Sequence, residues 1–147
     1  MKIGIDPGIS GAIAMLNDDD SLINVYDMPV MAGTGKRQQV NASELAKLLS
    51  HSHGTSYLER VSAMPKQGVS SMFSFGTSYG IVLGVLAALQ IPIVLVTPQR
   101  WKKTAGLTGK EKDMARTLAQ QLYPEAELGR KKDIGRADAI LIARFGI

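Results

Sequence analysis

Three acidic residues stand in stretches of sequence that otherwise predict a protein interior: Asp6, Glu59 and Asp138. Asp6 ends a stretch whose alternating apolar residues predict a strand, and a Pro-Gly turn follows it. Glu59 lies in the predicted strand 56–61, and Asp138 directly precedes the apolar run 139–143. A carboxylate removed from water requires a cation, a metal ion or a proton. We therefore interpret these acids as candidate ligands of a common site.

The types of side chain that are missing limit the chemistry of such a site. The sequence has no Cys and only two His, His51 and His53. This excludes disulfides and thiol nucleophiles, and it makes classical zinc chemistry unexpected. A metal site in this chain must be built from oxygen ligands, which suits Mg²⁺ or Mn²⁺.

Each of the three acids also has an ordinary structural explanation. Asp6 suits a cap of the Pro-Gly turn. Glu59 could pair with Arg60, although neighbouring strand residues face opposite sides of a sheet. Asp138 could be an acid near a helix N-terminus, where the helix dipole favours negative charge. These alternatives stand beside the metal site at this point.

Positive charge is concentrated near the end of the chain. The net charge is +4, and residues 97–147 hold eleven Lys and Arg against six Asp and Glu. A basic third suits a polyanionic partner such as nucleic acid, while an ordinary solvated surface is the alternative. We expect one domain, residues 1–147, acting in the cytoplasm. The apolar runs are too short for a membrane partner, the opening strand disfavours a signal peptide, and we expect no small-molecule cofactor.

The spacing of apolar residues predicts a mixed architecture of strands and helices. An antiparallel meander is predicted from strands near 2–5, 12–16 and 22–28, followed by a loop over 29–39. Another strand is expected at 91–96, where the continuous apolar run is typical of burial on both faces. Helices are predicted from residue 41 or 43 to 49, and over 70–89, 98–103, 110–123 and 130–144.

The predicted helix 70–89 carries a stripe of small residues. Gly76, Gly80, Gly84 and Ala88 recur every four residues and so share one side of a helix. Each glycine costs about 1 kcal/mol relative to alanine in a helix interior. The stripe is tolerable where another backbone packs very close, which could be the sheet, a helix of the same chain or a second subunit.

The order of elements and four sequence segments resemble a known family. Three strands, helix, strand, helix, strand and then helices is the order of the ribonuclease H-like fold. The segments IGIDPGISGAIA, YLERVSAMPKQGVSSMFSFGTSYG, VTPQRWKK and GRADAILIARFG resemble RuvC-type Holliday junction resolvases, particularly the short forms encoded by phages. The resemblance implies an α/β ribonuclease H-like fold. Its five-stranded mixed sheet has three antiparallel strands, then two parallel ones, and is flanked by helices.

The resemblance also implies a function and a set of site residues. It implies a homodimeric crossover junction endodeoxyribonuclease that nicks four-way DNA junctions symmetrically by two-metal-ion phosphodiester hydrolysis. Mg²⁺ is the expected ion, with Mn²⁺ as a substitute, in the cytoplasm of a phage-infected bacterium. Asp6, Glu59 and Asp138 would hold the metals, and Lys103 and Lys112 would contact the scissile phosphate.

Two surfaces follow from the same resemblance. The expected DNA contacts are made by basic residues, namely Lys66, Arg100, Lys102, Lys103, Lys110, Lys112 and Arg116. The glycine-striped helix resembles the family's dimer helix, so the expected dimer interface consists of Phe75, Gly76, Tyr79, Gly80, Leu83 and Gly84.

The sequence departs from the family at two places. The family commonly has a second acid or a His one turn before the final Asp, where this chain has Ile134 and Gly135. Asp133 is the nearest acid and is the predicted fourth ligand. In the loop 62–68, Ser62 stands where some relatives have an aromatic residue that stacks in the junction. Either Met64 or Phe73 substitutes for it, or junction opening differs.

These departures keep a second function open: a junction- or branched-DNA-binding protein with weakened or broader nuclease activity. A sugar-kinase-like phosphate site also begins with an Asp-x-Gly pattern. It requires a second, similar domain, for which 147 residues leave no room.

Overall fold

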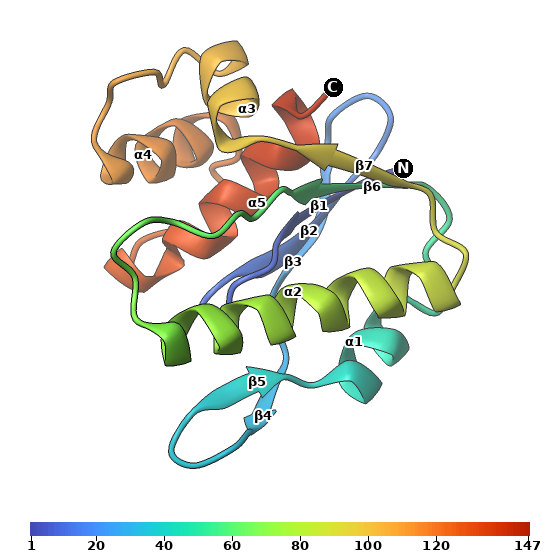
Figure 1. The fold of residues 1–147 in the computed structure, drawn as a ribbon. Coiled ribbons are helices and arrows are strands. Elements are labelled where there is room, and N and C mark those ends of the chain that lie inside the picture. The colour runs from blue at the N-terminus through green and yellow to red at the C-terminus, as the bar shows by residue number, and fades with distance from the viewer.

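A five-stranded mixed sheet forms the centre of the computed structural model, which describes residues 1–147. Its strands run in the order β3 (Leu22–Asp27), β2 (Ala12–Leu16), β1 (Lys2–Asp6), β6 (Thr55–Glu59) and β7 (Ile93–Val96) (Figure 1). The first three strands are antiparallel, and β6 and β7 run parallel to β1. The predicted ribonuclease H-like arrangement of strands is confirmed.

Helices cover both faces of this sheet (Figure 1). On one face lie α1 (Ala42–Leu49) and α2 (Val69–Ala88), and on the other lie α3 (Pro98–Thr104), α4 (Lys112–Leu122), the short 3-10 helix η1 (Lys131–Asp133) and α5 (Ile134–Phe145). Two buried apolar clusters separate in the same way, one under each helical layer. The strands contribute residues to both clusters, because successive side chains of a strand point to opposite faces of the sheet.

The structure corrects three details of the predicted elements. The segment predicted as a loop over 29–39 contains a hairpin, β4 (Val30–Ala32) with β5 (Gln38–Val40). Strand β7 lies at the sheet edge with Val94 and Leu95 exposed, so the predicted burial on both faces is wrong. A continuous apolar run does not show whether a strand lies at the centre or the edge of a parallel sheet, because its position depends on the strands that pair beside it. The last helix begins at Ile134, after the turn η1.

Very close packing holds α5 against β1. Gly4 lies on the face of β1 opposite Ile3 and Ile5, and a Cβ at Gly4 would collide with the carbonyl oxygen of Ala139. Ala143 lies beside the same point, one turn further along α5. Only small residues on both partners allow this approach. It brings the start of α5 to the end of the sheet where β1 and β6 terminate.

Helix α2 packs on the sheet with one side only. Ser78, Val82 and Leu86 are buried, and the glycine stripe lies about 200° around the helix from them. Nothing lies within 4 Å of where a Cβ would stand on Gly76, Gly80 or Gly84. The close neighbour that the stripe predicts is therefore not within this chain.

By length and composition alone, α2 is long and apolar enough to cross a membrane. Its most apolar window has a mean hydropathy of 1.4, and 22% of that window is buried inside the protein. The core helix of a non-membrane protein passes the same test, and the buried stripe of α2 packs in the apolar cluster beneath it.

Candidate active site

Asp6 and Glu59 end two neighbouring parallel strands. In the register of β1 and β6, Ile5 lies opposite Leu58, so Asp6 and Glu59 follow side by side. Ile5 and Leu58 point into the cluster under α2, and alternation turns the next residue of each strand toward α5. Two carboxylates therefore meet on one face of the sheet at its carboxyl end.

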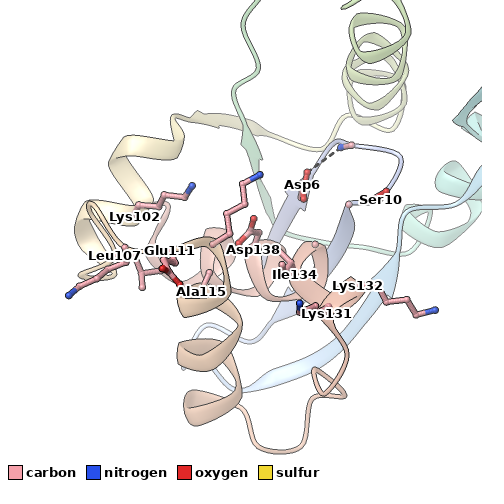
Figure 2. Close-up of a pocket in the computed structure, with 15 residues that line it drawn as sticks. Asp6, Ser10, Lys102, Leu107, Glu111, Ala115, Lys131, Lys132, Ile134 and Asp138 are labelled. Carbon is pink, nitrogen blue, oxygen red and sulfur yellow. Dashed lines mark hydrogen bonds between the residues drawn. The ribbon is translucent and has the colours of Figure 1, made fainter. Parts of the chain in front are cut away.

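Asp138 approaches the same end of the sheet from α5. It is the fifth residue of that helix, and the residues after it, from Ala139 to Ala143, are buried against the sheet. A cavity of about 390 Å³ is lined by both Asp6 and Asp138. Figure 2 shows the two side chains projecting into this space from β1 and α5.

Burial disfavours ionisation of all three acids, and repulsion by neighbouring acids adds to it at Glu59 and Asp138. Burial raises the pKa of Asp6 and the pKa of Glu59 above their ordinary values. Burial, followed by repulsion from Asp6 and Glu59, raises the pKa of Asp138 to about 7. None of the three forms an ion pair with Lys or Arg. Clusters of acids with raised pKa values are typical of functional sites.

One oxygen of each strand-end acid is held by a hydrogen-bond donor. The backbone N–H of Gly8 donates to Asp6 Oδ1 over 3.2 Å. The indole Nε1–H of Trp101, which begins the second turn of α3, donates to Glu59 Oε1 over 2.9 Å. The second oxygen of each carboxylate remains available to another partner.

The donor set fits a hard divalent cation. It consists of carboxylate oxygens that are shielded from water and lack a cationic side chain, which is the chemistry that Mg²⁺ and Mn²⁺ prefer. No three acidic or histidine side chains are already gathered tightly enough to hold one ion between them. A cation between Asp6, Glu59 and Asp138 would therefore draw the side chains together and relieve their repulsion.

Five lysines line the cavity that contains Asp6 and Asp138. We call them the lysine belt: Lys102, Lys110, Lys112, Lys131 and Lys132. Lys102 and Lys112 act in the opposite sense to burial and lower the pKa of Asp138. The structure places Lys102 at the acids in the position predicted for Lys103, which is exposed and does not line the cavity. Adjacent helical residues point about 100° apart, and a Lys-Lys pair in the sequence leaves the choice between them open.

Asp133 does not line the cavity, and its contacts disfavour the predicted role as fourth ligand. Its side chain is 3% exposed, and its Oδ1 accepts from Arg130 Nη2 over 2.8 Å. Its Oδ2 accepts from the backbone N–H of Arg130 over 2.8 Å. These interactions hold the pKa of Asp133 below its usual range. A carboxylate already satisfied by a guanidinium and a backbone donor has little to offer a metal ion.

Ile134 and Gly135 line the cavity in place of the second acid of the family. A Cβ on Gly135 would collide with the carbonyl oxygen of Ser10 in the turn between β1 and β2. The helix thus approaches this turn too closely for any side chain at position 135. The candidate site therefore has no room for an acid at position 135.

Three further residues that were predicted to contact DNA do not line the cavity. Arg116 does not line the cavity: it pairs with Asp113 over 2.8 Å and donates to the Leu128 carbonyl oxygen over 3.0 Å. Lys66 and Arg100 are exposed but do not line the cavity. Sequence reasoning did not single out Lys131, Lys132 or Trp101, although the run of basic residues before Asp133 was a visible signal for the two lysines.

Comparison with known proteins supports the resemblance to resolvases. No protein-family model matches the chain. The Holliday junction resolvase MOC1, a chloroplast protein of Chlamydomonas reinhardtii, is 28% identical over an alignment of 150 residues. The match covers 84% of this chain and 17% of that protein, so the chain spans a small part of its relative's length.

Solved structures of RuvC share the fold. The structure of Thermus thermophilus RuvC matches with a TM-score of 0.60 at 15% identity, covering 96% of this chain and 89% of that one. The complex of the same protein with a Holliday junction substrate matches with a TM-score of 0.59 at 15% identity and the same coverage. The chain is RuvC-like in fold, and the resemblance to RuvC-type Holliday junction resolvases is confirmed.

Proposed function

We propose that this chain, RuvC-like in fold and similar in sequence to a Holliday junction resolvase, is a structure-selective endonuclease that cuts four-way DNA junctions by metal-dependent hydrolysis. The observation that carries the proposal is the placement of Asp6, Glu59 and Asp138 at the carboxyl end of the sheet, next to a cavity that five lysines line. A cluster of half-buried acids without cationic partners lowers stability, and a role in binding cations explains why the chain carries it.

The residues divide into two chemical roles. Asp6, Glu59 and Asp138 would hold two Mg²⁺ ions, or Mn²⁺ in their place, and these ions supply charge neutralisation and an activated water. Lys102 and Lys112 would neutralise the phosphate as charge develops on its oxygens. Asp6 lies beside Glu59 in the sheet and shares the cavity with Asp138, and its second oxygen is unbonded, so it would hold the metal ions together with both of these acids.

The surface around the cavity suits branched DNA. The lysine belt around the acids gives phosphates a positively charged landing surface. The loop after β6 begins at Arg60 and leads into α2, and it carries Met64 with an exposed fraction of 62%. Phe73, on the first turns of α2, is 77% exposed. Apolar side chains exposed beside a phosphate-binding surface are suited to unstacking bases at the centre of a junction.

Symmetric cutting requires two active sites, and a two-fold dimer provides them. The outer side of α2 is the surface we assign to this dimer, because its glycine stripe faces open space and Phe75 beside it is 37% exposed. Glycines at this spacing allow two helices to approach closely. Tyr79 and Leu83 flank the stripe and are only partly buried within the monomer.

The test of the activity is cleavage of a synthetic four-way junction, compared with three-way and linear duplex DNA, in Mg²⁺ and in Mn²⁺. We expect Asp6→Asn to abolish cleavage while junction binding is kept, because the phosphate contacts are made by lysines. The matched control is Asp18→Asn, whose carboxylate is 88% exposed in the turn after β2. Full cleavage by Asp6→Asn in Mg²⁺ would refute the mechanism.

The same assay decides the second candidate function, a junction-binding protein with weakened or broader nuclease activity. It is favoured by one observation, namely that the close approach of Gly135 to Ser10 leaves no space for an acid at this position. Tight junction binding without cleavage in either metal, or equal cleavage of all branched substrates, would support this alternative.

The dimer has a test of its own. Gly80→Arg places a charged side chain in the middle of the stripe, where the monomer has free space. We expect a folded monomer by light scattering, and nicking of only one strand per encounter. Ser43→Arg, on the exposed side of α1, is the control and remains dimeric. Wild-type protein that is monomeric, or that partitions onto lipid vesicles through α2, would contradict the assignment.

A further inference from the structure

Trp101 contacts the site from inside the core. It is the only tryptophan in the chain, it is fully buried, and it belongs to α3, which follows β7 directly. Its indole N–H donates to Glu59 Oε1 over 2.9 Å. Indole nitrogen is a donor only, so it requires an acceptor and is satisfied by a carboxylate oxygen. The contact joins two positions 42 residues apart.

The geometry leaves Glu59 half engaged. The indole occupies Oε1, and no other hydrogen bond or ion pair is made by the carboxylate. Because the indole ring is locked in the core, it limits rotation of the carboxylate about its terminal bond. The free oxygen, Oε2, then has a restricted set of directions, which lowers the entropy cost of binding a cation.

The face of the same ring contacts a cation. Lys102 Nζ lies 5.3 Å from the centre of the Trp101 ring, a cation–π distance. Lys102 also lines the cavity that contains Asp6 and Asp138. One buried side chain therefore contacts an acid through its edge and a lysine through its face.

We propose that Trp101 is a positioning residue for the metal site, and that it orients the free oxygen of Glu59 while its ring face holds Lys102 beside Asp138. The inference rests on the proposed function, since it assumes that the three acids bind divalent cations. It adds that the affinity for the cation depends on an indole that touches neither metal nor DNA. Outer-shell donors of this kind are worth about 10–100-fold in metal affinity.

The variant that isolates the hydrogen bond is Trp101→Phe, which keeps an aromatic face for Lys102 and removes the N–H. The matched control is Tyr123→Phe, because Tyr123 is also buried and its hydroxyl donates to the Asp20 carbonyl oxygen over 2.8 Å. Both variants lose one buried donor and keep a ring in the core, but only the first faces the acids. Thermal melting with EDTA measures the cost to the fold in each.

The deciding measurement is Mn²⁺ affinity without DNA, obtained from the free Mn²⁺ signal in electron paramagnetic resonance. We expect Trp101→Phe to weaken Mn²⁺ binding about 10-fold and Tyr123→Phe to leave it unchanged. Equal affinity in wild type and Trp101→Phe would overturn the positioning role and leave the proposed function intact. Wild-type protein that neither binds Mn²⁺ nor cuts junctions would instead overturn the proposed function.

Fluorescence gives a second, independent measurement, because all tryptophan emission comes from Trp101. We expect Mg²⁺ to change this emission saturably in the wild type. Glu59→Asp, which withdraws the carboxylate from the indole but keeps its charge, should shift the emission in the absence of metal. This variant also serves if Trp101→Phe does not fold. Emission that is insensitive to both Mg²⁺ and Glu59→Asp would overturn the proposal.

Discussion

The turn η1 and the carboxyl end of the sheet each contain an aspartate that is largely shielded from water. The two aspartates have opposite electrostatic surroundings. At η1, Asp133 is surrounded by donors from Arg130, which hold the pKa of its carboxyl low. At the sheet end, five residues later in the chain, Asp138 has no ion-pair partner, and its pKa is raised to about 7. In the sequence Asp133 follows three basic residues and Asp138 precedes an apolar run, and in the structure only Asp133 gains an ion-pair partner.

This contrast distinguishes an acid that stabilises the fold from an acid that is available to a ligand. A carboxylate that meets a guanidinium and a backbone donor stabilises the fold near it. A carboxylate placed among other carboxylates destabilises the fold until a cation or a proton arrives. Stability is lost where a ligand is to be bound, which is a common cost of function.

Between these two aspartates, the greater loss of activity is expected from Asp138→Asn. Loss of a ligand should lower junction cleavage by at least about 100-fold, since even outer-shell groups are worth 10–100-fold. Cleavage time courses in Mg²⁺ measure this loss. Wild-type rates in this variant would remove Asp138 from the functional side of the comparison.

The same variant should make the protein more stable at high pH. The pKa of Asp138 rises from 3.8 to about 7 on folding, so the folded state binds more protons than the unfolded state between these values. Stability due to this group therefore falls as pH rises through that window. With EDTA, Asp138→Asn should melt above the wild type at pH 8 and close to it near pH 4, with roughly 2–4 °C for each kcal/mol relieved. A constant difference across pH would contradict the assigned cause.

Asp133→Asn should have the opposite signature. It removes the charge that Arg130 pairs with, and we expect a melting temperature lower by several degrees at pH 7. The loss should disappear as pH falls below the normal range of an Asp, because a lowered pKa contributes stability only while the acid is ionised. Mn²⁺ affinity should stay at the wild-type value. Weaker Mn²⁺ binding with an unchanged melting temperature would restore Asp133 as a ligand.

The smallest effect on activity is expected from Gly135→Asp, which adds the acid that the family pattern has at this position. A side chain there collides with the Ser10 carbonyl oxygen, so the turn between β1 and β2 must shift. We expect a lower melting temperature and no gain in cleavage rate. Cleavage faster than wild type would show that the site accepts a fourth carboxylate.

Much of the site could be predicted because its signals are local. Asp6 follows an alternating strand and a turn motif, and Glu59 ends a short apolar strand. Their neighbouring positions follow from parallel pairing of β1 and β6, which the order of elements implies. The glycine stripe was equally visible, but it left open what covers it, and the structure removes the candidates within the chain.

Other features depended on contacts that no sequence pattern contains. The sequence does not distinguish the neighbouring lysines Lys102 and Lys103. The orientation of α3 places Lys102, and not Lys103, in the cavity wall. No sequence pattern singles out Trp101, whose indole N–H reaches Glu59 only because α3 packs beside the end of β6. The exposed edge of β7 depends on the absence of a further strand beside it.

Sequence patterns alone predicted the order of the five sheet strands and the long helices, and they singled out Asp6, Glu59 and Asp138, because hydrophobic periodicity and turn residues act over a few positions. The folded arrangement was needed to place Asp138 and Lys102 at the cavity, to pair Asp133 with Arg130, and to show that a side chain at Gly135 has no space. These features depend on which side chains and backbone atoms surround a residue after the chain has folded. Arg130, the turn at Ser10 and the indole of Trp101 each become neighbours only when α3 and α5 lie against the sheet.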